Sequence, residues 1–389
     1  MKTRLLLTAL FVGVFLSEPL FAQGQPPIPC QKNWNNAAGT GFWVHPGNWA
    51  EGVVPQDDEN ACINGTFTVA IGYDEFSPAR ANALFLSANS DMYFAGGVGD
   101  YLALCKHLPC ANSWIDGEME VLLQGTGGKL FIQNSMTFQG SGAIVMIGGS
   151  RIDPVAGFNP TVTLGNGLAL EGFGNVGVDL VSNGAITVFN GSMVFEKNLT
   201  LNGSMTIQPT ATVELTNNLT LPAAATINME ASGGLNSKLK PRVGYNPILT
   251  LNSGGTLSGA GEIYLTPGSS YTLTNNGKVV ARNGTLVLKE AGQGSGIWAA
   301  ETATGVLRAE KEIKGNGKWE LKNHAGARIE INAQSRCLSG NVDITRGTLH
   351  ALQSFRASGQ LLFVGNDAVI KVEGGRSAEF STSLVGCGG

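Results

Sequence analysis

Residue types that carry acid–base, nucleophilic or metal chemistry are scattered along this chain. Its four histidines share no motif: His45, His107, His324 and His350. A serine hydrolase is not indicated, because no Gly-x-Ser-x-Gly sequence supplies a nucleophile. A phosphate-binding loop is not indicated either, since no Gly-Lys-Ser or Gly-Lys-Thr sequence occurs.

The carboxylates are the better candidates for chemistry. Their densest cluster is Asp57, Asp58 and Glu59, which could bind calcium through hard oxygen ligands, although we favour a solvated acidic turn. Carboxylates gathered in one groove with a basic residue would indicate a polysaccharide lyase or a glycoside hydrolase; the candidates are Asp179, Glu196, Glu214, Glu230 and Lys197. They share no regular spacing, and glycoside hydrolysis needs two carboxyl groups at a fixed separation. We therefore favour outward charges that keep the surface soluble, with catalysis as the alternative.

Six cysteines are the other reactive side chains: Cys30, Cys62, Cys105, Cys110, Cys337 and Cys387. An even number in an exported chain favours disulfides. The most local pairing is Cys105–Cys110, with Cys30–Cys62 and Cys337–Cys387 joining residues near the two ends. A metal site is not favoured, because the sequence has no CxxC pair or Cys/His cluster.

The beginning of the chain has the layout of a secretory signal peptide. Lys2 and Arg4 precede an apolar run from Leu5 to Leu16, and Ala22 offers a small residue at the expected cleavage point. A membrane anchor would need roughly 20 apolar residues, and this run is shorter. We expect residues 1–22 to be removed, and the mature chain, without a transmembrane segment, to be extracellular or at the outer cell surface.

Composition points to a β protein rich in turns. Glycine accounts for 54 of the 389 residues, and charged residues for only 14 %. Helical bundles are built from other residue types, and a hydrophobic fraction of 43 % argues against disorder. The net charge of −4 gives no electrostatic reason to expect nucleic acid or an anionic membrane as partner.

The elements that must position any site are short strands. Beyond Gly117, segments with alternating apolar residues follow one another, separated by turn residues such as Asn-Gly. The Leu-Thr-Leu segments at Leu199 and Leu219 recur one plausible coil length apart. We predict a parallel β-solenoid of about 12 coils after Gly117 and a length on the order of 60 Å, with an antiparallel β-sandwich series as the alternative.

Two segments interrupt this pattern and are expected to be loops between coils. Ser232–Pro247 contains Lys238, Lys240 and Arg242, and Gly292–Gly305 contains Trp298. On a rod, a partner would bind at such loops, so these four residues are the binding candidates.

A different pattern occupies residues 34–71. It reads Trp34-Asn-Asn, Gly41-Phe-Trp-Val, Gly47-Asn-Trp-Ala-Glu-Gly-Val-Val-Pro55, an acidic turn, Asn64-Gly65 and Val69-Ala-Ile71. This spacing of Trp, Gly and Pro resembles the module near the start of bacterial exported and surface β-helix proteins of the autotransporter-passenger and filamentous-haemagglutinin-like kind. The resemblance implies a β-solenoid that acts as an adhesin.

The three tryptophans of this module, Trp34, Trp43 and Trp49, need no ligand to explain them. The first coil of a solenoid exposes backbone edges, and a cluster of aromatic rings can cover them. We favour such a cap over a sugar-stacking platform. The expected organisation is a signal peptide at 1–22, a cap module at 23–115 and the solenoid at 116–389.

These observations predict an all-β, non-enzymatic exported protein that presents a rigid solenoid to a glycan or a protein. One alternative is a polysaccharide lyase or glycoside hydrolase on the same scaffold. The other is a subunit or fragment of a larger envelope assembly, which would self-associate through an uncapped coil. No cofactor is expected apart from the calcium considered above.

Overall fold

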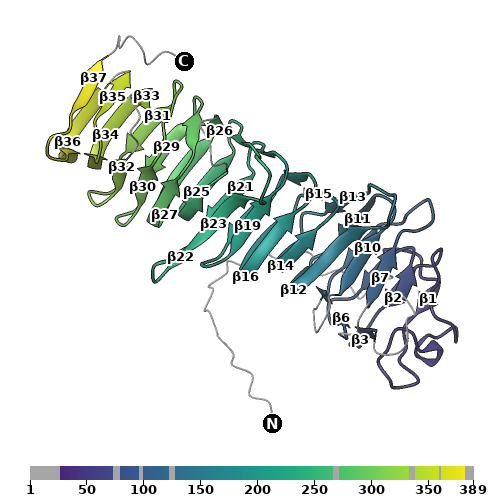
Figure 1. Cartoon of the computed structure of the whole chain (residues 1–389). Helices are drawn as coiled ribbons and strands as arrows, with labels where there is room; N and C mark the ends of the chain where they lie inside the picture. The colour runs from purple at the N-terminus through teal and green to yellow at the C-terminus, as the bar shows by residue number, and fades with distance from the viewer. Residues whose placement is uncertain are drawn as a thin grey trace.

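Short alternating segments stack into one elongated, parallel β-solenoid of about 13 turns (Figure 1). The structure is a computed structural model that describes residues 27–72, 79–95, 100–121, 128–265, 271–332, 338–358 and 361–381. Within these residues every strand ladder is parallel except the hairpin of β22 (Ala231–Ser232) with β23 (Leu235–Pro241). The predicted solenoid is therefore confirmed, and the antiparallel sandwich is wrong.

Each coil contributes strands to three faces. The first face consists of β1 (Lys32–Asn33), β2 (Ala61–Ile63), β5 (Leu84–Leu86), β8 (Ser113–Ile115), β11 (Met136–Gln139), β13 (Thr161–Leu164), β15 (Asp179–Ser182), β17 (Leu199–Leu201), β20 (Leu219–Leu221), β24 (Leu249–Leu251), β26 (Tyr271–Asn275), β28 (Ala291–Gln293), β33 (Leu338–Ser339), β35 (Phe355–Ser358) and β37 (Ala378–Ser381). Along the rod these strands form three successive sheets, β1 to β17, β20 to β28 and β33 to β37.

The second and third faces belong to one continuous sheet. The second face holds β3 (Thr68–Ile71), β6 (Asp91–Phe94), β9 (Glu118–Val121), β18 (Ser204–Ile207), β21 (Thr226–Met229), β29 (Ile297–Ala300) and β31 (Lys318–Leu321). The third face holds β4 (Ala79–Ala81), β7 (Tyr101–Leu104), β10 (Lys129–Ile132), β19 (Thr212–Leu215), β23, β30 (Val306–Ala309) and β32 (Arg328–Ile331). Longer strands bend from the second face to the third: β12 (Ala143–Pro154), β14 (Ala169–Val176), β16 (Ala185–Phe195), β25 (Thr256–Ile263), β27 (Lys278–Leu288), β34 (Asn341–Ala351) and β36 (Leu361–Val372).

The hydrophobic core runs along the axis of the rod. In β17 and β20 the outer leucines of Leu-Thr-Leu are buried and the central threonine is exposed, as a strand with one buried face requires. The same columns continue into β24, whose Leu249 and Leu251 are in register with Leu219 and Leu221. The recurrence predicted from Leu199 and Leu219 therefore reflects consecutive coils.

Glycine allows the strands to bend between faces. Gly172 in β14 and Gly259 in β25 have φ of +100° and +113°, a region that L side chains rarely adopt. A Cβ at either position would lie about 2 Å from a backbone oxygen of the preceding coil, Met146 O or Met229 O. This close approach explains part of the high glycine content.

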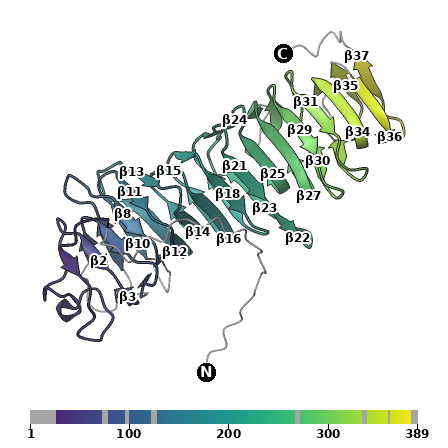
Figure 2. The ribbon, with the colours of Figure 1, turned by 180° about the vertical axis from the view of Figure 1, so that it is seen from behind.

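Coil length varies while the columns stay in register. Partner residues are 16 positions apart at Ala169 and Ala185, and 30 apart at Leu219 and Leu249. The extra residues of the longer coil form the β22–β23 hairpin and the loop before β24; the hairpin projects from the rod in both views (Figure 2).

Three buried tryptophans cover the N-terminal end of the core, as expected for a cap. Trp49 packs edge-to-face against Trp34 and Trp43, with ring centroids 5.1 and 4.8 Å away. The indole nitrogen of Trp49 donates a hydrogen bond to Trp43 O at 2.9 Å. The Trp43 N–H donates to Ala70 O, which attaches this segment to β3. The 3₁₀-helix η1 (Pro46–Asn48) lies in the same segment.

Complete coils already begin at β2, and β2 to β8 belong to the same faces as the later strands. The expected boundary at residue 115 therefore does not mark the start of the solenoid. Two predicted disulfides, Cys30–Cys62 and Cys105–Cys110, are present. The proposed Cys337–Cys387 pair and the signal peptide at 1–22 lie outside the described residues.

Both segments predicted to be inserted loops contain strands. Lys238 and Lys240 lie on β23, with the buried Leu239 between them. Trp298 lies on β29, is 1 % exposed and stacks on Trp319 in the core. Outside these strands, the first segment continues as a loop from Arg242 to Ile248, and the second contains residues 294–296 and 301–305, which belong to no strand. In the described part of the chain, no helix has the length and apolar character needed to span a bilayer.

Candidate functional site

The carboxylates considered for catalysis do not meet in one groove. Glu196 lies at the end of the bent strand β16 and accepts hydrogen bonds from Arg151 and Arg242, each at 2.8 Å. Burial alone would raise the pKa of Glu196, but the two guanidinium groups outweigh it and hold that pKa below its ordinary value. Glu196 is therefore an ionised partner in a charge network.

The remaining three carboxylates also have structural partners. Glu214 on the third face is 2.9 Å from Lys240 Nζ. Asp179 on the first face accepts hydrogen bonds through Oδ1 from the backbone N–H and the side-chain amide of Asn198, at 3.0 and 2.9 Å. Glu230 follows β21 and accepts a bond from Asn228. These groups are distributed around the rod, which favours the structural interpretation of the charges.

The acidic cluster near the N-terminus is likewise engaged with cations of the chain. Asp57 pairs with Arg80 and Lys106, and Glu59 pairs with Lys32 at 3.1 Å. Among the described residues, no group of three or more His, Cys, Asp or Glu side chains could hold a metal ion. The geometry therefore offers calcium no ligand set at Asp57, Asp58 and Glu59.

The four predicted binding residues are not equivalent. Trp298 is buried and has no surface to offer. Lys240 and Arg242 are half-buried and occupied by Glu214 and Glu196, while Lys238 is exposed. Beside them the loop from Arg242 to Ile248 presents an apolar tip, since Val243 is 94 % exposed.

The structure contains a groove that the sequence did not reveal. On the first face no ladder joins β17 to β20 among the described residues, so the sheet is interrupted between two successive coils. A shallow pocket of about 400 Å³ lies there. Seven uncharged residues line it: Asn198, Leu199, Thr200 and Asn202 from one coil, and Asn218, Thr220 and Pro222 from the next.

Hydrogen bonds between coils orient the amides of this groove. Asn202 donates to Asn183 Oδ1 of the preceding coil at 2.9 Å. Asn198 Oδ1 accepts a bond from Asn217 at 3.1 Å. Asn218 Oδ1 accepts the backbone N–H of Ile248 at 2.8 Å, so the exposed loop is joined to the edge of the groove. The polar groups are thus held in fixed directions, as a binding site requires.

The groove lies within a longer column of β-branched side chains. In register along the first face, Thr137 is followed by Thr163, Val181 and Thr200, and Thr220 is followed by Thr250 and Thr274. The alternating strand directs each of them outward. The two threonines at the groove, Thr200 and Thr220, are exposed, whereas Thr137 and Thr163 are half-buried.

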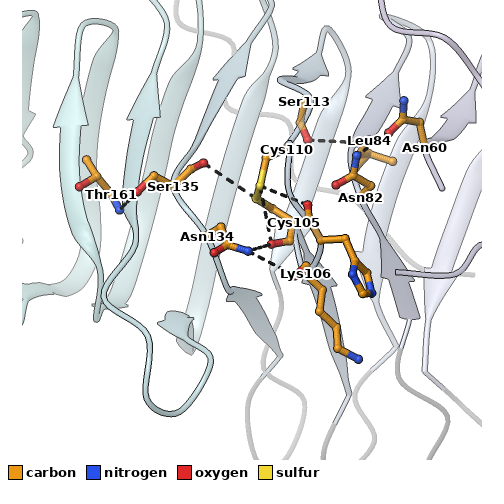
Figure 3. Close-up of a disulfide and its surroundings, with 11 residues drawn as sticks. Asn60, Asn82, Leu84, Cys105, Lys106, Cys110, Ser113, Asn134, Ser135 and Thr161 are labelled. Atoms are coloured by element: carbon orange, nitrogen blue, oxygen red, sulfur yellow. Dashed lines mark hydrogen bonds between the residues drawn. A yellow bond between two sulfur atoms is a disulfide. The ribbon is translucent and has the colours of Figure 1, made fainter. Parts of the chain in front are cut away.

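Asparagine has a structural role in the turns that lead into the first face near its N-terminal end (Figure 3). Asn134 donates to Cys105 O at 2.9 Å, beside the Cys105–Cys110 disulfide, and Asn82 donates to Asn60 Oδ1 at 3.3 Å. Both cysteines are oxidised, so this loop offers no thiolate to a metal. The amides at the groove differ because they line a cavity.

Comparison of the chain with protein-family models, with curated proteins and with solved structures finds no match. The class of protein is therefore defined by the fold alone, an all-β parallel β-solenoid with a buried N-terminal tryptophan cluster.

Proposed function

We propose that this protein is an exported, non-enzymatic β-solenoid that binds a neutral glycan in the groove between β17 and β20. The uncharged lining of that groove supports the proposal most directly. Three asparagine amides and two threonine hydroxyls supply both donors and acceptors, which suits the hydroxyl groups of a sugar. An acidic polysaccharide would instead call for basic side chains in the lining.

A binding role is favoured over cleavage because the nearby carboxylate is already engaged. Asp179 Oδ1 holds Asn198 in place and thereby shapes the groove. Glycoside hydrolysis would need a second carboxyl group across the scissile bond. None of the seven lining residues is ionisable.

The exported location remains part of this proposal, as does kinship with surface adhesins. Residues 1–22 contain basic residues, then an apolar run and then a small residue, and this order supports export. Two disulfides support an oxidising compartment. The Trp, Gly and Pro spacing of residues 34–71 supports an adhesin of the autotransporter-passenger or filamentous-haemagglutinin-like kind.

The test is retention of the mature protein on immobilised neutral and acidic polysaccharides, with product formation followed in parallel. We expect retention on a neutral glycan without cleavage. Replacing Thr200 and Thr220 together by Val keeps the β-branched shape and removes two hydroxyls. This double variant should bind about 30-fold more weakly, since two hydrogen bonds at about 1 kcal/mol each contribute about 2 kcal/mol.

The matched control replaces Thr137 and Thr163 by Val, in the same column but outside the groove. It should bind as tightly as the parent protein. Equal binding by both double variants would exclude the groove as the site. Release of oligosaccharides by the parent protein would replace the binding proposal with an enzymatic one.

A further inference from the structure

The last coil leaves the hydrophobic core open at the C-terminal end of the described residues. By register, Leu361 and Val372 of β36 continue the inward columns of Val342 and Ala351 in β34. Val342 and Ala351 are 3 % and 0 % exposed, whereas Leu361 and Val372 are 37 % and 36 % exposed. The same apolar columns thus pass from buried to exposed within one coil.

The strand that carries these residues has an available edge. Strand β36 pairs with β34 on one side, and the described residues contain no further strand that pairs with it. A free edge presents unpaired backbone donors and acceptors and readily adds another strand. Apolar side chains beside such an edge make pairing more favourable still.

The charges of β36 are arranged so that the strand complements itself. Asp367, Val369 and Lys371 alternate along the third face, in register with the outward residues Arg346, Thr348 and His350. If two copies of β36 run antiparallel with Val369 opposite Val369, Asp367 of each copy faces Lys371 of the other. Opposite charges directly across an antiparallel pair are stabilising.

We propose that the partner of this edge is a second copy of the same chain, joined end to end through β36 about a two-fold axis at Val369. Such a contact is isologous, the commonest arrangement in homodimers. The inward residues Ala368 and Ile370 then lie opposite each other, which continues the core from one copy into the other.

The rest of the last coil is compatible with this axis. A two-fold axis through the third face exchanges the first and second faces, so the second-face half of β36 meets β37 of the other copy. The pairs that Asp367 and Lys371 make within the chain, with Arg346 and Glu373 at 3.3 and 3.1 Å, are exposed and leave both residues accessible. Exposed ion pairs of this kind contribute little to the stability of the chain, so exchanging them for pairs across the dimer contact costs little.

The test is the molar mass of the full mature chain in solution, measured by sedimentation from nanomolar to tens of micromolar concentrations. We expect a monomer–dimer equilibrium. Asp367→Lys or Lys371→Asp alone places like charges opposite each other and should raise the dissociation constant at least about tenfold. Combining the two restores opposite charges and should restore the dimer.

The matched control is Glu214→Lys, which disrupts an ion pair in the middle of the rod and should leave dimerisation unchanged. A chain that stays monomeric at every concentration overturns the proposal. A dimer whose dissociation constant changes with neither single reversal would show that β36 is not the contact surface. Dimerisation only of a chain ending at Ser381 would show that residues 382–389 cover the edge, and would overturn the proposal for the full chain.

Discussion

The two ends of the rod solve the same problem differently. At the N-terminal end, Trp34, Trp43 and Trp49 cover the first coil and are 4 %, 0 % and 2 % exposed. At the C-terminal end of the described residues, Leu361 and Val372 stand in core columns and are more than a third exposed. A solenoid needs a terminal cover for solubility. Within the described residues, the N-terminal end carries such a cover and the C-terminal end does not, and in the proposed dimer a second copy supplies it.

The largest effect should follow removal of the N-terminal cover. Trp43→Ala deletes a fully buried ring that packs on Trp49 and should cost about 3–5 kcal/mol. Because each coil contacts only its neighbours, the loss should be local to the first coils. Native-state hydrogen exchange should therefore show faster opening of β2 and β3 but not of β34. Equal acceleration along the rod would contradict this view of independent ends.

The next effect concerns the disulfide that holds the same cap. Replacing Cys30 and Cys62 by Ser should cost about 2–4 kcal/mol, because this bond closes a loop between residues 32 positions apart. The same change at Cys105 and Cys110, which are 5 positions apart, should cost less. Thermal unfolding of the two double variants measures the loss of stability that each one causes. A larger loss at Cys105 and Cys110 would refute the ranking.

A smaller contrast lies within one column at the C-terminal end. Val342→Ala removes a buried side chain and should cost about 1–2 kcal/mol, whereas Leu361→Ala should cost less than about 1 kcal/mol in a monomer. Urea unfolding measures the free energy of unfolding of both variants, at protein concentrations too low for a dimer to form. Equal losses would mean that Leu361 is covered in solution.

The smallest effect should be a pH dependence of the last coil. Hydrogen bonds from His350 and Lys371 hold the pKa of Glu373 below its ordinary value of 4.5. A carboxyl with a depressed pKa stabilises the fold above its unfolded-state pKa, and this stabilisation is lost as the pH falls through the folded-state pKa. The hydrogen-exchange protection factors of β34 and β36, which are the exchange rates of the unfolded chain divided by the observed rates at the same pH, should therefore decrease as the pH falls below 4.5. Glu373→Gln should remove the pH dependence attributed to this carboxyl.

The sequence predicted the fold well because its core columns are repetitive. Leu199 and Leu219 recur at the coil length, and Trp34, Trp43 and Trp49 are too large and apolar to remain exposed beside a free edge. Of the two described disulfides, Cys105–Cys110 was predicted from proximity in the chain and Cys30–Cys62 as a bond near the N-terminal end. Each of these signals is local or periodic, which makes it readable without coordinates.

The site was less predictable because it depends on contacts between coils. The sequence Lys238-Leu239-Lys240 alternates as a strand does, but its charge suggested a loop. The segment with Trp298 was predicted to be a loop because a run of Ala and Thr follows the tryptophan. The groove exists because no ladder joins β17 to β20 in the described part of the chain. The Leu-Thr-Leu sequence, which is the same in both strands, does not predict that this ladder is missing. Asn198 and Asn218 each precede a Leu-Thr-Leu segment, a position that marks the repeat but does not predict a groove.

The interruption between β17 and β20 also has a mechanical consequence. In a parallel solenoid the hydrogen bonds between coils point along the rod, so a pull on its ends loads every ladder at each junction. At this junction the second and third faces retain their ladders, β16–β18–β21 and β16–β19–β23, while the first face has none. Tension is carried there by two sides of the coil, so the rod should bend more easily at this junction, where the proposed ligand would sit, than at a junction that is paired on all three faces.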